Sequence, residues 1–88
     1  MVDLKFAKEV AAVEELIYDA LHDEVHEFGK KLYYESGDSD EIHRELENDR
    51  NKKCDEFLLN HPEYSARAFL KVYNFVLNEG VEMAKEMA

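Results

Sequence analysis

The stretch Glu9–Phe28, EVAAVEELIYDALHDEVHEF, decides the fold expected for this chain. It contains no Gly or Pro, and its apolar residues recur every three or four positions, at Val10, Val13, Ile17, Leu21, Val25 and Phe28. That spacing places them on one stripe of an α-helix. From Glu9 to Gly29 there are also seven acidic residues and no Lys or Arg. The stretch therefore predicts a long amphipathic helix with a strongly negative outer side.

Two further helical segments follow, and we expect one domain over residues 1–88. The polar run Glu35–Asp40 is typical of a loop, and Pro62 suits the first turn of a helix. Local signals place an N-cap at Asp3 and capping boxes at Asp38–Glu41 and Asn60–Glu63. The predicted helices cover about residues 3–34, 40–59 and 63–87.

The first predicted helix is too long for a compact domain of this size. At ~1.5 Å per residue it would measure roughly 45 Å, whereas a compact chain of 88 residues has a radius of gyration of about 12 Å. We therefore expect the helix to bend near Gly29 or to pack its end on a second subunit. The predicted fold is all-α, an antiparallel three-helix bundle that dimerises through its first and third helices. A monomeric bundle with a kinked first helix is the alternative.

The third predicted helix has apolar or small residues at alternating spacings of three and four. This is the a/d pattern of a heptad repeat, and neighbouring apolar residues widen the face. We expect this seam to supply core and dimer contacts through Phe69, Tyr73, Val76, Gly80, Met83 and Met87.

The middle of the second predicted helix, residues 47–56 (ENDRNKKCDE), is polar on all sides. Glu24 presents a related problem, because it lies on the apolar side of the first helix and a buried carboxylate is costly unless it is paired. We expect Glu24 to pair with Lys53 or Arg50 in a core ion pair that sets the register of the two helices.

The net charge limits the classes of partner. With 21 acidic and 11 basic residues the chain carries −10 at pH 7, which argues against direct binding to nucleic acid or to an anionic membrane. No run approaches the ~18 apolar residues of a membrane span, and the N-terminus has no secretory h-region. The single cysteine, Cys54, fits a reducing compartment. We expect a cytoplasmic protein, in the host cytoplasm if the chain is viral.

Two acidic clusters form the candidate partner-binding surface. On the first helix, acids recur every four residues at a rise of about 6 Å per step, of the same order as the spacing of phosphates along a nucleic-acid strand. Such a surface imitates DNA and occupies the basic site of a nucleic-acid-binding protein; the alternative is an acidic face that only keeps the protein soluble. The candidate partner-binding residues are Glu15, Asp19, Asp23, Glu27, Asp38, Asp40, Glu41 and Glu45, with Tyr33 and Tyr34 as an aromatic contact.

His22 and His26, four residues apart, suggest a metal site as an alternative. Asp19 and Asp23 each precede one of them by three residues, and imidazoles with carboxylates suit Zn²⁺ or Ni²⁺. This side of the helix points away from the predicted core, however, so a closed site would need ligands from elsewhere. We predict no metal and no cofactor.

The sequence also lacks a nucleophile elbow, a phosphate-binding Gly loop and an H-E-x-x-H motif, so we predict no enzymatic activity. The functional hypothesis is a protein-binding module, an inhibitor or adaptor directed at a basic, nucleic-acid-binding partner. A metal-binding helical protein and a structural or assembly subunit are the alternatives.

Overall fold

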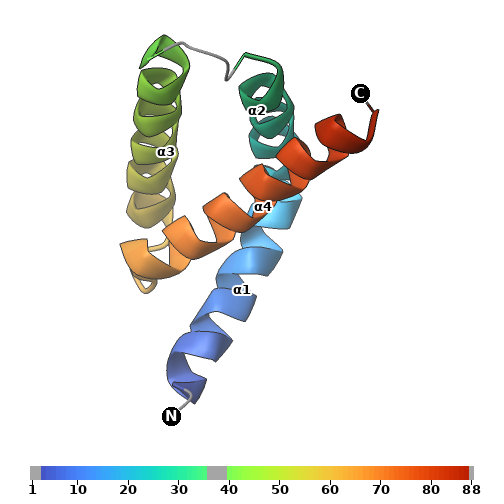
Figure 1. Ribbon diagram of the computed structural model, residues 1–88. Helices are drawn as coiled ribbons and strands as arrows, with labels where there is room; N and C mark the ends of the chain where they lie inside the picture. The colour runs from blue at the N-terminus through green and yellow to red at the C-terminus, as the bar shows by residue number, and fades with distance from the viewer. Residues whose placement is uncertain (1–2, 36–39, 88) are drawn as a thin grey trace.

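The computed structural model describes residues 3–35 and 40–87. Every secondary-structure element in that part of the chain is an α-helix (Figure 1): α1 Leu4–Ala20, α2 His22–Glu35, α3 Asp40–Asn60 and α4 Ala66–Met87. The all-helical prediction is confirmed. The predicted number of helices is wrong, because the first predicted helix is divided into α1 and α2.

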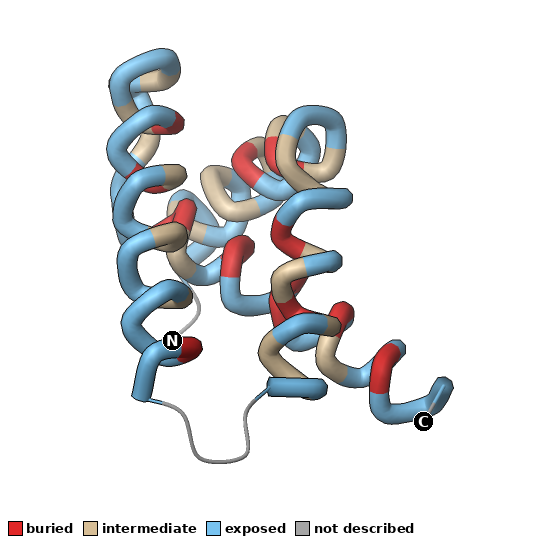
Figure 2. The backbone as a smooth tube through the Cα atoms, turned by 90° about the horizontal axis from the view of Figure 1, so that it is seen from above, coloured by how far each residue is buried: buried red, intermediate tan, exposed pale blue. Residues whose placement is uncertain are grey.

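The helices are arranged around α4. α1 and α2 together run in one direction, α3 returns, and α4 crosses back obliquely in contact with all three (Figure 1). Buried positions lie on the helix sides that face one another (Figure 2), and the largest fully buried side chains are Val13, Ile17, Val25, Phe69, Tyr73 and Val76. The radius of gyration is 13.7 Å, slightly above the roughly 12 Å of a compact chain of this length.

The break between α1 and α2 falls at Leu21, where φ is −126° and ψ is −6°, outside the usual α-helical values. The buried residues on either side, from Val13 to Gly29, recur in multiples of four. At ~100° per residue, a straight helix would turn Gly29 about 160° away from Val13. The break therefore lets both α1 and α2 face α4. The chain bends at Leu21 and not near Gly29, so the predicted position of the bend is wrong. The physical reason is that buried residues spaced by multiples of four can all face α4 only if the helix breaks between them.

Gly29 is instead the point of closest approach between α2 and α4, where it meets Gly80. A Cβ atom added to Gly29 would lie 2.2 Å from the backbone oxygen of Leu77, and one added to Gly80 would lie 2.1 Å from the backbone oxygen of His26. Neither glycine has a positive φ. Both are therefore required by the close backbone contact rather than by an unusual conformation.

The predicted seam of α4 is confirmed in part. Phe69, Tyr73, Val76 and Gly80 are buried, but Met83 and Met87 are 43% and 69% exposed. After Gly80 the buried position is Ala84, because small residues on this side of α4 permit the close crossing with α2. Met83 and Met87 therefore lie outside the core of the single chain, and their predicted role in a dimer contact stays a prediction.

α4 begins three residues later than predicted, at Ala66, and Ser65 is its N-cap. The Ala68 N–H donates to Ser65 Oγ (3.2 Å), while the Ser65 N–H and hydroxyl both donate to Glu9 Oε1 of α1 at 2.7 Å. These hydrogen bonds lower the pKa of Glu9 below its ordinary value. The predicted Asn60–Glu63 capping box does not form, because Asn60 belongs to α3 and its side chain donates to Glu56 O.

The polar middle of α3 faces the buried hydroxyl of Tyr73. Tyr73 OH donates to Asp49 Oδ2 at 2.7 Å, and Asp49 also pairs with Lys53. Burial and this hydrogen bond raise the pKa of Tyr73. Lys53 Nζ lies 3.7 Å from Glu24 Oε2, so the predicted Glu24–Lys53 pair is confirmed. Because the Glu24 side chain is 67% exposed, it is a surface pair and the predicted core position is wrong.

Candidate functional site

The four acidic residues of the predicted ladder are all exposed. Glu15 and Asp19 lie on α1, and Asp23 and Glu27 lie on α2. The break at Leu21 separates the two pairs, so the even rise of about 6 Å per step holds within each pair and not across the four. The four residues form an exposed acidic surface that crosses a bend, which we call the acidic surface.

Nearby cations neutralise only part of the acidic surface. Lys30 Nζ donates to Glu27 Oε1 at 3.1 Å, and His22 Nδ1 lies 3.3 Å from Asp23 Oδ1, an ion pair only when the imidazole is protonated. Within residues 3–35 and 40–87, Glu15 and Asp19 take part in no ion pair. Most of the negative charge on this surface is therefore available to a partner.

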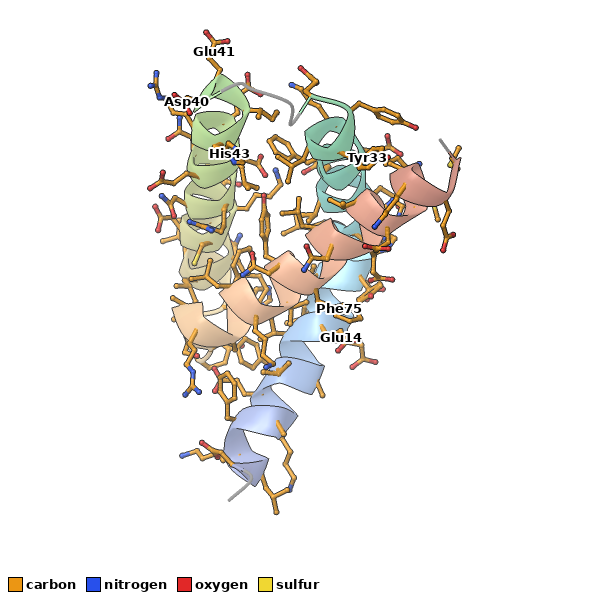
Figure 3. The ribbon with its side chains drawn as sticks, in the orientation of Figure 1. Glu14, Tyr33, Asp40, Glu41, His43 and Phe75 are labelled. Atoms are coloured by element: carbon orange, nitrogen blue, oxygen red, sulfur yellow. The ribbon has the colours of Figure 1, made fainter. Side chains whose placement is uncertain are left out.

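The second predicted acidic cluster lies at the start of α3. Asp40 and Glu41 are exposed in the first helical turn (Figure 3). Their negative charges there interact favourably with the positive end of the helix dipole. Glu45 Oε2 accepts a hydrogen bond from Lys31 Nζ at 3.1 Å, which ties α3 to α2 and raises the pKa of Lys31. Asp38 lies outside the described residues. This cluster is divided between an exposed end and an interhelical ion pair.

Tyr33 and Tyr34 lie in the last turn of α2. Their rings make an edge-to-face contact, with the ring centroids 5.4 Å apart. Tyr34 is 61% exposed, whereas Tyr33 is half-buried. Tyr34 follows Asp23 and Glu27 by eleven and seven residues, spacings that keep all three on one side of a helix. Tyr34 therefore extends the acidic surface with an exposed aromatic ring.

The His22 ring stacks with the rings of Tyr18 and His26. The ring centroids are 4.8 Å apart for Tyr18–His22 and 5.2 Å apart for His22–His26. Tyr18 OH donates to Glu79 of α4, and this hydrogen bond raises the pKa of Tyr18 to about 12. Nowhere in the described part of the chain do three or more His, Cys, Asp or Glu residues, Asp19 and Asp23 included, form a group that could hold a metal ion.

A second exposed surface lies along α4 beside α1 and α2, and the sequence analysis did not identify Phe75 as part of it. Phe75 is 56% exposed and Met83 is 43% exposed. Phe75 and Glu14 line one hollow of about 350 Å³, and Phe75 and Met83 line another of about 400 Å³. Figure 3 shows Phe75 and Glu14 near the crossing of the two helices. In the sequence, Phe75 is hard to distinguish from the apolar residues that make α4 the central helix.

None of the four helices in the described part of the chain has the length and apolar character that a membrane crossing requires. Comparisons with protein-family models, with curated proteins and with solved structures give no match for this chain. Its function therefore has to be inferred from its own surfaces.

Proposed function

We propose that this chain is a non-catalytic binding module, an inhibitor or adaptor that acts as a DNA mimic by occupying a basic, nucleic-acid-binding surface of a partner protein. The observation that supports this proposal is the exposure of Glu15, Asp19, Asp23 and Glu27 on α1 and α2 with few cations beside them. Tyr34 and the exposed acids Asp40 and Glu41 add to the same class of surface.

The physical basis is electrostatic complementarity. A net charge of −10 speeds association with a basic surface and repels acidic ones. Each exposed ion pair contributes only about 0.2–1 kcal/mol, so affinity depends on several pairs at once and falls as salt screens them. The close packing of α2 on α4 holds part of the acidic surface in place, which reduces the entropy lost on binding.

The homodimer is a separate prediction. The excess length of the first helix is accommodated by the break at Leu21, and most of the apolar face of α4 is covered within one chain. The proposed function does not depend on a second copy.

We propose a cytoplasmic location because Cys54 is a buried thiol whose pKa is raised by burial, which suits a reduced, unreactive cysteine.

The test is capture of a partner by the immobilised chain at low salt, followed by elution with high salt or with duplex DNA. We expect a nucleic-acid-binding protein that both treatments release. The variant Glu15→Lys, Asp19→Lys, Asp23→Lys should weaken its binding about a hundredfold, because three attractive contacts become repulsive.

The matched control is Glu47→Lys, Asp55→Lys, Glu63→Lys, which changes the net charge equally at exposed positions outside the acidic surface. This control should retain the partner, and circular dichroism should show that both variants fold. Equal capture by the wild-type chain and by the variant with the reversed acidic surface would refute the proposal.

A further inference from the structure

We infer that the surface around Phe75 is a docking groove for a basic amphipathic helix of the partner protein. This inference rests on the proposed function and adds to it an apolar anchor and the shape of the partner segment. We call this region the Phe75 surface; it comprises Phe75, Met83, Glu14, Glu79, Glu82 and Glu86.

Phe75 stands between two hollows and lines both of them. The first hollow, of about 350 Å³, lies between α1 and α4 and has Val10 and Val72 in its wall. The second, of about 400 Å³, lies between α2 and α4 and has His26 and Met83 in its wall. An aromatic ring that is 56% exposed with a recess on each side is the arrangement found where a partner packs apolar side chains around an anchor residue.

Carboxylates surround this apolar anchor. The two hollows and the adjoining one beside Tyr18 are lined by a single lysine, Lys71, and by five acidic residues: Glu14, Glu15, Glu79, Glu82 and Glu86. The hydrogen bond from Tyr18 OH to Glu79 joins α1 to α4 here, so the acids of both helices belong to one surface. A ligand that fits must therefore carry apolar groups in the middle and positive charge on the flanks.

The dimensions of the Phe75 surface match a helix. Phe75 and Met83 are eight residues apart, so they lie about 12 Å apart along the axis of α4. A partner helix with apolar residues at i and i+7 separates them by about 10.5 Å. Such a helix can pack one apolar side chain against Phe75 and the other against Met83, while Lys or Arg residues beside them reach the carboxylates.

Charge distinguishes this occupant from the others. A second copy of this chain would bring two carboxylate-lined surfaces together, and like charges across an interface oppose association. Anionic lipid and nucleic acid are repelled for the same reason. A basic amphipathic helix covers Phe75 and Met83 and pairs with their acidic neighbours at the same time.

The test is titration of the full chain, followed by fluorescence anisotropy, with a labelled 18-residue peptide. The peptide has Leu at helical spacing on one side and Lys elsewhere; the comparison peptide has the same composition in scrambled order. We expect the amphipathic peptide to bind about tenfold or more tightly than the scrambled one, and Phe75→Ser to remove that advantage. The matched control is Leu59→Ser, which removes another exposed apolar side chain, on α3, where Leu59 is 82% exposed, and should bind like the wild-type chain.

The outcomes separate this inference from the proposed function. If both peptides bind equally to the wild-type chain and to Phe75→Ser, negative charge alone accounts for binding; the docking groove is then refuted and the proposed function stands. If neither peptide binds even at low salt, both fail. If Phe75→Ser changes only self-association, measured by sedimentation equilibrium, the Phe75 surface is a contact between copies and the inference is overturned.

Discussion

Substitution of Gly80 by alanine tests the close crossing of α2 and α4, where Gly29 meets Gly80. The added Cβ would lie 2.1 Å from the His26 oxygen, and both the Gly80 Cβ and its obstacle are fixed to backbone. To restore an ordinary separation of about 3.4 Å, α2 and α4 must move apart by more than 1 Å at this point. No side-chain rotation can relieve the clash.

Two opposing effects set the magnitude. Alanine stabilises a helix interior relative to glycine by about 0.5–1 kcal/mol. Overpacking typically costs 1–3 kcal/mol and occasionally more, and we place Gly80→Ala at the upper end because the obstacle is a backbone carbonyl. The net expectation is a loss of about 2 kcal/mol in the free energy of unfolding. For a domain of this size that corresponds to a fall in Tm of about 8–16 °C.

The assay is thermal and urea unfolding followed by circular dichroism at 222 nm. Asn74→Ala is the matched control: it changes an exposed position in the same helix, adds the same kind of helix propensity without a clash, and should leave Tm unchanged or slightly raised. Combining Gly29→Ala with Gly80→Ala should cost less than the sum of the two, because the first change already separates the helices. A Gly80→Ala variant as stable as Asn74→Ala would refute the close crossing.

Two further predictions concern polar contacts between helices. Tyr73→Phe removes the hydrogen bond to Asp49 from a fully buried ring and should lower the free energy of unfolding by about 1–2 kcal/mol, measured by urea denaturation; no change would mean that the bond contributes nothing. Glu9 has a lowered pKa in the folded chain, so its contribution is fully present above its ordinary pKa of 4.5 and is lost as pH falls through the lowered value. The difference in stability between the wild-type chain and Glu9→Gln should therefore shrink on acidification below pH 4.5, and a difference that is independent of pH would contradict this assignment.

Signals confined to one helical turn could be predicted from the sequence. Asp3 was expected as an N-cap, and its Oδ1 accepts the Phe6 N–H at 3.0 Å. The bounds of α3 agree with the prediction within one residue. These features depend on hydrogen bonds between near neighbours in the chain, so the local sequence contains the information they need.

Features that depend on distant residues could not be predicted in the same way. The N-cap Ser65 is fixed by Glu9, 56 residues earlier in the chain, and no local pattern shows this. Ala84 replaces Met83 as the buried position because of how closely α2 approaches α4 at Gly29. The spacing of four residues between Val13, Ile17, Leu21 and Val25 is visible in the sequence and favours a break near Leu21, eight residues before Gly29.

The same distinction applies to the candidate surfaces. Exposure of the acidic residues followed from the amphipathic pattern, because charged side chains opposite the apolar stripe of a helix stay in contact with water. The exposure of Phe75 did not follow, because the number of helices that cover α4 is a property of the whole fold.

The first half of α3 is held mainly by polar contacts, and this affects the order in which parts of the molecule unfold. Between Asp40 and Asn48 only Ile42 is buried, and the Lys31–Glu45 pair is exposed, so little apolar area holds this half of α3 in place. Sub-global opening is cheapest where buried apolar contacts are fewest. Backbone amides in this half of α3 should therefore exchange with deuterium well before those at the crossing of α2 and α4, as a separate cooperative unit within one small domain.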